Sequence, residues 1–329
     1  MSEFIEPVGE TSQKSDIKAK PVPLLVISVL LNAFLLGYFF RYRFSETRQI
    51  KDLQKTTQTQ TVNSADKTEQ EAIFSEINPV EGYSLKVSFG NLGPNMIKSG
   101  VIDLKKFEDT YERSAQPLTK EQITILTRGS DQPVVITREN SYFLLNFFWA
   151  VGLANKSKIL EEGQITKPGG IKEAGNFAST GGWTLGKEPA MNYFSKSRLI
   201  ALTPAQEELV SRAASNIFRP CCNNSTAFPD CNHGMALLGV LQLMASGGAT
   251  EEEMYKAAKY FNAYWFPSNY YDLALFFKNS LKQSFAEADA RLVVSGEYSS
   301  SAGTQKVKQW LASKGLVQEP PKTGGGCGV

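Results

Sequence analysis

An uncharged apolar stretch lies close to the N-terminus of this chain. Residues 21–40 (PVPLLVISVLLNAFLLGYFF) contain no Asp, Glu, Lys or Arg. A helix of this length spans about 30 Å, the thickness of a bilayer's hydrocarbon core. Basic residues bracket the stretch and no small-residue cleavage site follows it, which disfavours a cleaved signal peptide. The pattern predicts a single transmembrane anchor at residues 21–40, after a short N-terminal tail at residues 1–20.

The segment after the predicted anchor, residues 41–78, is polar and rich in Thr, Gln, Lys and Glu. So few large apolar side chains cannot bury enough surface to offset the entropy of ordering the chain. We therefore predict a polar linker there. Residues 79–318 have the composition of a globular domain, and residues 319–329 are expected to form a flexible Gly-rich tail.

Helical signals dominate the predicted globular domain. Four side chains suited to helix N-caps precede residues at helical spacing: Asp103, Thr119, Thr203 and Thr250. Residues 139–154 and 235–244 are apolar on almost every face, which predicts buried helices. Further helices are expected at residues 268–282 and 304–313, and only residues 134–136 are predicted as a short strand. The fold class is therefore mainly α: a single transmembrane helix, a polar tether and one predominantly helical domain.

Charge excludes one broad class of function. The 329 residues carry a net charge of only +2, with acidic and basic residues interspersed. Such a chain offers no basic stripe for phosphates, so we do not expect nucleic-acid binding.

The side of the membrane on which the domain lies is less sharply indicated. Three lysines precede the predicted span within twenty residues and five basic residues follow it within twenty, which by the positive-inside rule favours a cytoplasmic domain. A short N-terminal tail before a lone anchor, however, commonly stays inside while the longer part is exported. We expect an extracytoplasmic domain and keep the cytoplasmic orientation as the alternative.

The candidate chemistry lies in the scarce residues. The chain has four cysteines and one histidine, and Cys221, Cys222, Cys231 and His233 fall within one short stretch. Cys231 and His233 would lie at the N-terminus of the buried helix, where the helix dipole favours thiolate. Thiolate and imidazole ligands suit Zn, Cu(I) or an iron–sulfur cluster. We predict a Cys3His metal site, with Cys327 in the C-terminal tail as an optional further ligand.

The pattern Cys222-x2-Ser225-x2-Phe228-Pro229-x-Cys231 resembles the central part of the CDGSH iron–sulfur motif. The resemblance implies a [2Fe-2S] cluster held by three cysteines and one histidine. The sequence departs from that motif at both ends, because Cys221 adjoins Cys222 and His233 follows Cys231 by two positions rather than four.

A second resemblance extends over most of the predicted domain. The sequences RPCC at residues 219–222 and CNHGM at residues 231–235, with the Gly-rich C-terminus, resemble a set of prokaryotic membrane-anchored proteins. That resemblance implies no activity. The metal therefore stays open among Zn, Cu(I) and [2Fe-2S].

The expected function is that of a membrane-tethered metal-binding protein, for metal handling or electron transfer. It would contact the membrane through residues 21–40 and a protein partner near the membrane surface. One alternative is a disulfide-stabilised or thiol-redox interaction domain, in which Cys221 or Cys222 bonds to Cys231 and the other to Cys327. A metalloenzyme of unknown reaction is the other alternative, so whether the chain is an enzyme stays open.

Overall fold

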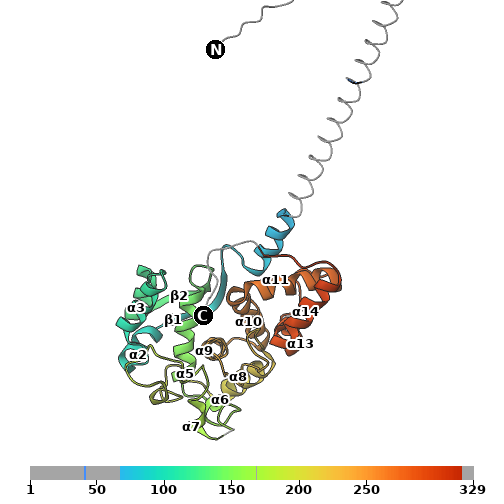
Figure 1. Cartoon of the computed structure of the whole chain (residues 1–329). Coiled ribbons are helices and arrows are strands. Elements are labelled where there is room, and N and C mark those ends of the chain that lie inside the picture. Colours follow the sequence, from blue (N-terminus) through green and yellow to red (C-terminus); the bar gives the residue numbers. More distant parts are fainter. Residues whose placement is uncertain (1–40, 42–66, 168, 321–329) are drawn as a thin grey trace, which may run out of the picture. The chain divides into compact units, whose positions relative to one another are not determined.

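The computed structural model describes residues 41, 67–167 and 169–320 (Figure 1). The chain divides into two units, residues 1–66 and 67–329, and every described residue except Arg41 belongs to the second. The predicted anchor and Cys327 lie outside the described residues. Among the helices that are described, none combines the length and the hydrophobicity needed to cross a membrane.

The second unit is mainly helical, which confirms the fold class predicted for the globular domain. In chain order the elements are a helical segment at residues 67–77, β1 (Tyr83–Gly90), α2 (Leu92–Ser99), α3 (Leu104–Arg113), α4 (Lys120–Arg128), β2 (Ser130–Ile136), α5 (Ser141–Ala154), α6 (Lys158–Glu161) and α7 (Ile171–Ala174). They continue with the 3-10 helix η1 (Ala190–Asn192), α8 (Pro204–Asn216), α9 (Asn232–Ser246), α10 (Glu251–Trp265), α11 (Pro267–Phe276), the π-helix η2 (Phe277–Leu281), α12 (Ala290–Val293), α13 (Gly296–Ser299) and α14 (Ser301–Ser313).

The predicted N-caps start the helices that they were expected to start. Thr119, Thr203 and Thr250 each form a capping box with the side chain three residues later, and Asp103 accepts a hydrogen bond from the Lys106 N–H. These side chains satisfy backbone donors that have no partner within the helix. The predicted last helix begins earlier than residue 304, because Ser300 caps it by accepting from the Gly303 N–H.

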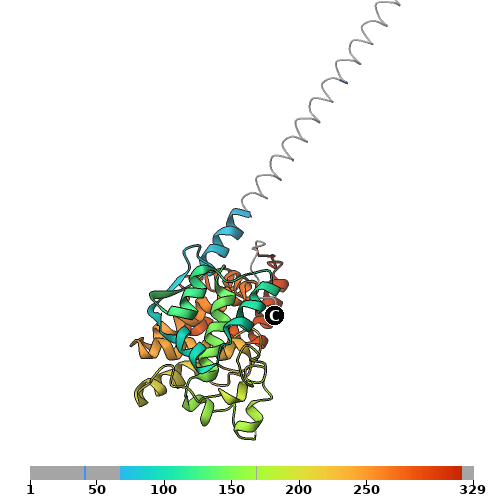
Figure 2. The ribbon, with the colours of Figure 1, turned by 90° about the vertical axis from the view of Figure 1, so that its left-hand side faces the viewer.

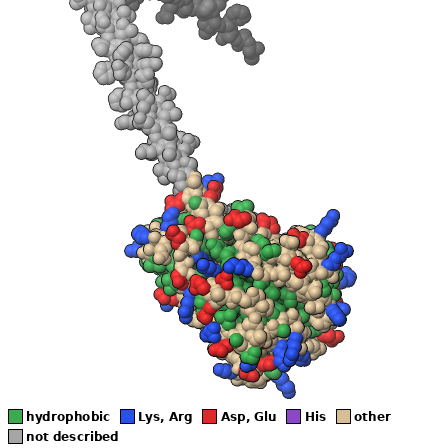
Figure 3. Space-filling model, turned by 180° about the vertical axis from the view of Figure 1, so that it is seen from behind, with side chains coloured by type: hydrophobic (Ala, Val, Ile, Leu, Met, Phe, Trp, Pro, Cys, Tyr) green, Lys and Arg blue, Asp and Glu red, His purple; other side chains and the backbone are tan. Residues whose placement is uncertain are grey.

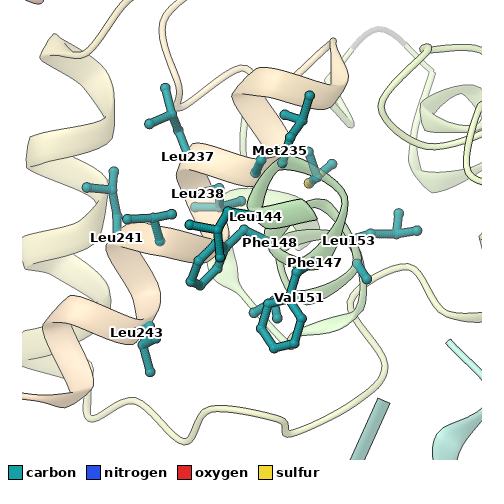
Figure 4. Close-up of a cluster of buried hydrophobic side chains, with 14 of the residues drawn as sticks. Leu144, Phe147, Phe148, Val151, Leu153, Met235, Leu237, Leu238, Leu241 and Leu243 are labelled. Atoms are coloured by element: carbon teal, nitrogen blue, oxygen red, sulfur yellow. The ribbon is translucent and has the colours of Figure 1, made fainter. Parts of the chain in front are cut away.

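Helices α5 and α9 pack against each other at the centre of the larger hydrophobic cluster (Figure 4). Their backbones touch at two glycines. A Cβ on Gly152 would lie 2.0 Å from the Met235 carbonyl oxygen, and one on Gly239 would lie 2.5 Å from that of Phe148. Most residues of both helices are buried on every face, as predicted from their uniformly apolar sequences. The packing fixes the position of α9 and with it the residues at its N-terminus.

The helical segment at residues 67–77 belongs to the folded unit, although a polar linker was predicted up to residue 78. Its side chains Ile73, Phe74 and Ile77 are buried in a second cluster with α11 and α14. Figure 2 shows this segment at one end of the unit. The unit therefore begins at about residue 67, because a few apolar residues in a polar segment suffice to dock one face of a helix.

A two-stranded antiparallel sheet completes the unit. The predicted residues 134–136 form the end of β2, which pairs with β1 from Tyr83↔Ile136 to Gly90↔Ser130. On the face seen in Figure 3, Lys and Arg side chains are interspersed with Asp and Glu.

Candidate metal centre

The cysteines lie on the loop between α8 and α9, which we call the cysteine loop (residues 217–231). The first residue of the loop is tied to its second half by hydrogen bonds from the N–H and hydroxyl of Thr226 to the Ile217 carbonyl, at 2.8 and 3.0 Å. Phe218 and Ser225 form an antiparallel bridge beside them. The chain therefore turns back on itself after Cys222 and brings Cys221 close to Cys231, ten residues later.

The side chain of Arg219 lies inside the curve of the cysteine loop and has no exposed surface. Its Nε donates to the Cys231 Sγ at 3.1 Å, and its two terminal nitrogens donate to the carbonyls of Asn224 and Phe228 at 2.9 and 3.1 Å. The guanidinium also forms an ion pair with Asp230. The planar fork of an arginine suits this task because it donates in several fixed directions at once. A fully buried cation with this many partners makes Arg219 the organising residue of the loop.

Cys231 is the N-cap residue of α9, and its Sγ accepts from the Gly234 N–H at 3.4 Å. The Sγ of Cys221 lies 3.3 Å from that of Cys231. His233, in the first turn of α9, is buried with its ring centroid 4.4 Å from that of Phe266. The ligand atoms of Cys221, Cys231 and His233 all lie within 4.8 Å of one another, which is close enough to hold one ion. We call these three residues the inner triad.

Cys222 belongs to a second group, with Asp230 and Cys231, whose ligand atoms also lie within 4.8 Å of one another. Its Sγ is 3.5 Å from an Asp230 carboxylate oxygen and 3.8 Å from the Asn224 carbonyl. The guanidinium of Arg219 already contacts both Asp230 and Cys231. Because the Asp230 carboxylate is already paired with this guanidinium, it is less available to a metal cation, and the inner triad is the better cation site.

The predicted ligands are therefore brought together, but as two overlapping sets that share Cys231. Neither Arg219 nor Asp230 was predicted as a residue of the site. Their positions in the sequence were the signal that could have identified them. Arg219 lies two residues before Cys221, and Asp230 directly precedes Cys231. Cys327 lies outside the described residues and stays a prediction as a further ligand.

The thiols differ strongly in acidity. Hydrogen bonds from Cys221 and Cys222, assisted by His233 and the positive charge of Arg219, hold the pKa of Cys231 well below its usual value despite burial. The pKa of Cys221 is raised, chiefly by its hydrogen bonds to Cys222 and Cys231 and by burial. A hydrogen bond with Cys221 lowers the pKa of Cys222, but the hydrogen bond with Cys231 and burial outweigh it and raise this pKa to about 11. Cys231 is thus the thiol most ready to bind a metal, because the thiolate is the ligand.

Neighbouring elements hold the cysteine loop from several sides. The N–H of Ser301 at the start of α14 donates to the Cys222 carbonyl at 2.9 Å, and that of Ala302 donates to the Asn223 side chain at 2.8 Å. Near the end of the loop, the Ser179 N–H donates to the Asp230 carbonyl at 3.2 Å. These contacts fix the loop backbone and so pre-organise the thiols.

The imidazole of His233 is also available to a ligand. Its Nε2 is buried and finds no hydrogen-bond partner among the described residues. A buried polar atom normally has a partner, and a metal ion can supply one. Cys221, Cys222 and Cys231 are free thiols, with no disulfide among them.

No family model matches the chain, and no curated protein or solved structure matches it either.

Proposed function

We propose that the chain is a membrane-tethered metal-binding protein that holds one zinc ion, or a divalent ion of similar preferences, through Cys221, Cys231 and His233. The single observation that carries the proposal is the convergence of these three ligand atoms to within 4.8 Å of one another. The membrane attachment is supported by the uncharged residues 21–40.

Distances favour a single ion over a cluster. Two thiolates on one tetrahedral zinc, with bonds of about 2.3 Å, lie roughly 3.8 Å apart. The Sγ atoms of Cys221 and Cys231 are 3.3 Å apart, so a small outward shift of one side chain reaches that spacing. A [2Fe-2S] cluster distributes four ligands over two irons and needs a wider arrangement.

Charge favours a divalent ion over Cu(I). Arg219 and Asp230 neutralise each other. Two thiolates and a neutral imidazole then bring two negative charges, which a divalent ion cancels and Cu(I) leaves half compensated. A partly buried site favours the neutral combination because uncompensated charge is costly away from water.

The test is metal analysis of the full chain, purified in detergent and supplied with zinc or copper(I). We expect one equivalent of zinc per chain in the unaltered protein and in Cys222→Ser, and loss of zinc in Cys231→Ser and His233→Ala. Circular dichroism of each variant checks that the helices persist. Stoichiometric copper(I) with weak zinc binding would reverse the choice of ion. Unchanged occupancy in both Cys231→Ser and His233→Ala would overturn the site.

A dithiol redox pair is the second candidate function, and the 3.3 Å between the sulfurs of Cys221 and Cys231 favours it. Cys231, with its lowered pKa, would be the attacking thiolate on an external disulfide and Cys221 the resolving thiol. A count of free thiols after equilibration with a glutathione redox buffer separates the two functions. Metal binding that withstands this buffer supports the metal site, whereas a stable Cys221–Cys231 disulfide in zinc-containing buffer supports the redox pair.

A further inference from the structure

We infer that Cys221, Cys222 and Cys231, which we call the three loop thiols, together bind one trivalent element with a high affinity for sulfur, such as arsenic(III) supplied as arsenous acid. The inference goes beyond the proposed function. The zinc site uses His233 and leaves out Cys222, whereas this overlapping site uses Cys222 and leaves out His233. The two proposals can therefore fail separately.

The three loop thiols lie in one compact group. The Sγ of Cys221 is 3.3 Å from that of Cys231, and the Sγ of Cys222 lies within 4.8 Å of the same atom. Cys222 hydrogen-bonds to both of the other thiols, and all three are free. Sulfur atoms this close can all bond to one central atom after small rotations of their side chains.

The number of bonds that the central atom forms selects the element. Arsenic(III) is soft and forms three bonds to sulfur in a pyramid, with a lone pair in place of a fourth ligand. A zinc ion takes four ligands in a tetrahedron and accepts imidazole nitrogen as readily as sulfur. Three thiols without the imidazole therefore complete the coordination of arsenic(III) but not that of zinc.

Charge points to the same trivalent class. Arg219 and Asp230 form an ion pair and neutralise each other, so the charge of the site is that of its thiolates and of the bound element. Three thiolates bring three negative charges, which a trivalent centre cancels and a divalent ion leaves partly uncompensated. The neutral combination is favoured because the site is partly buried, and uncompensated charge is costly away from water.

The loop gives such an element a point of entry and two thiols held behind it. Cys221 is exposed, whereas Cys222 and Cys231 are partly buried. The first bond therefore forms at Cys221, and the next two form within the chain at a high effective concentration. The Ser301 N–H holds the backbone carbonyl of Cys222 at 2.9 Å. The Cys222 thiol lies 3.5 Å from an Asp230 carboxylate oxygen, a weak hydrogen bond that costs little to give up.

Binding is a condensation with no change of oxidation state. At each step a thiol S–H bond and an As–OH bond break, an As–S bond forms, and the proton and hydroxide leave as water. Three such steps convert arsenous acid and the three loop thiols into a neutral tris-thiolate and three water molecules.

The experiment uses the full chain in detergent, reduced and metal-free, with Cys327→Ser in every protein so that only the three loop thiols are counted. Titration with sodium arsenite is followed by native mass spectrometry and by the thiols that still react with an aromatic disulfide reagent. We expect one arsenic per chain and the loss of three reactive thiols. His233→Ala should bind arsenite as tightly as this parent protein. Cys222→Ser should bind it about a hundredfold more weakly, because the third bond within the chain is lost.

Phenylarsine oxide is the matched control ligand. Its arsenic carries a phenyl group and forms only two bonds to sulfur, for which Cys221 and Cys231 suffice. Cys222→Ser should therefore bind phenylarsine oxide as tightly as the parent protein does.

Three results overturn the inference: two blocked thiols per arsenite in the parent protein, equal arsenite affinity in Cys222→Ser, or loss of both arsenicals in a Cys222→Ser variant whose helices persist by circular dichroism. Failure of the proposed function looks different, since zinc occupancy would then not depend on His233 while the arsenite results stayed as expected.

Discussion

Gly234 lies directly against the guanidinium of Arg219: a Cβ at this position would be 2.5 Å from the Arg219 Cζ and 2.6 Å from its Nη2. The glycine in the first turn of α9 therefore makes room for the cation that organises the cysteine loop. A side chain of any size at Gly234 would push the guanidinium away from Cys231 and Asp230.

Gly234→Ala tests this relationship. We expect the free energy of unfolding to fall by about 1–3 kcal/mol, as for overpacking of a filled interior. Zinc affinity should fall with it, because Cys231 loses its guanidinium partner. Urea unfolding and zinc competition titrations measure the two effects. Combining Gly234→Ala with Arg219→Lys should cost less than the sum of the single changes, since the narrower ammonium relieves the clash. Strict additivity would contradict the proposed contact.

Arg219→Met tests the loop from the other partner. The change removes the cationic partner of Asp230, which keeps its hydrogen bond from Asn224, and the donor to two backbone carbonyls, so we expect a loss of about 3–5 kcal/mol in unfolding free energy. Arg212→Met is the matched control, because Arg212 on α8 is half exposed and pairs with Glu208 and Glu251 at the surface. It should cost no more than about 1 kcal/mol. Equal losses in the two variants would show that Arg219 does not organise the loop.

The crossing of α5 and α9 provides a test far from the metal ligands. Gly152→Ala and Gly239→Ala each place a methyl group against backbone of the other helix. Each should lower the unfolding free energy by at least about 1–3 kcal/mol, because neither backbone can yield without disturbing the core. Ser246→Ala, at the exposed end of α9, should stay within about 0.5 kcal/mol of the unaltered protein. Thermal or urea unfolding gives the comparison.

Local signals predicted most of the helical fold. The caps at Thr119, Thr203 and Thr250 and the uniformly apolar α5 and α9 act over a few residues, so the sequence alone reveals them. Strand β1 was missed because its pairing depends on residues 130–136, far along the chain, although its alternating Leu85, Val87 and Phe89 were a signal.

The candidate site was predictable from scarcity but not in its geometry. Three thiols and the single histidine close together indicated a cluster. Which of two adjacent cysteines faces His233 depends on the loop path, and that path depends on Arg219 and on contacts from α14. Because a charged residue is rarely buried, no sequence signal predicted that Arg219 would lie at the centre of the loop.

A buried lysine in α10 makes stability depend on pH. Lys259 is 2% exposed, donates to the carbonyls of Phe285, Ala286 and Ala288, and has a pKa lowered to about 8, chiefly by burial. The ordinary lysine value is about 10.4. Between these two values the unfolded chain binds the proton and the folded chain does not, so the contribution of Lys259 to stability rises with pH in this window. Below pH 8 both states are charged and the full cost of burying the charge is present.

Lys259→Met removes this titration and leaves the other groups in place. We expect the unaltered protein to gain stability relative to the variant as pH rises from about 8 to about 10.4, and the difference to be flat below pH 8. Urea unfolding of both proteins at matched pH measures the difference, in which the titrations of tyrosines and thiols cancel. A difference that stays constant across the window would mean that Lys259 remains charged in the fold, held by its three carbonyl partners and by the ring of Phe285, 4.4 Å from its Nζ.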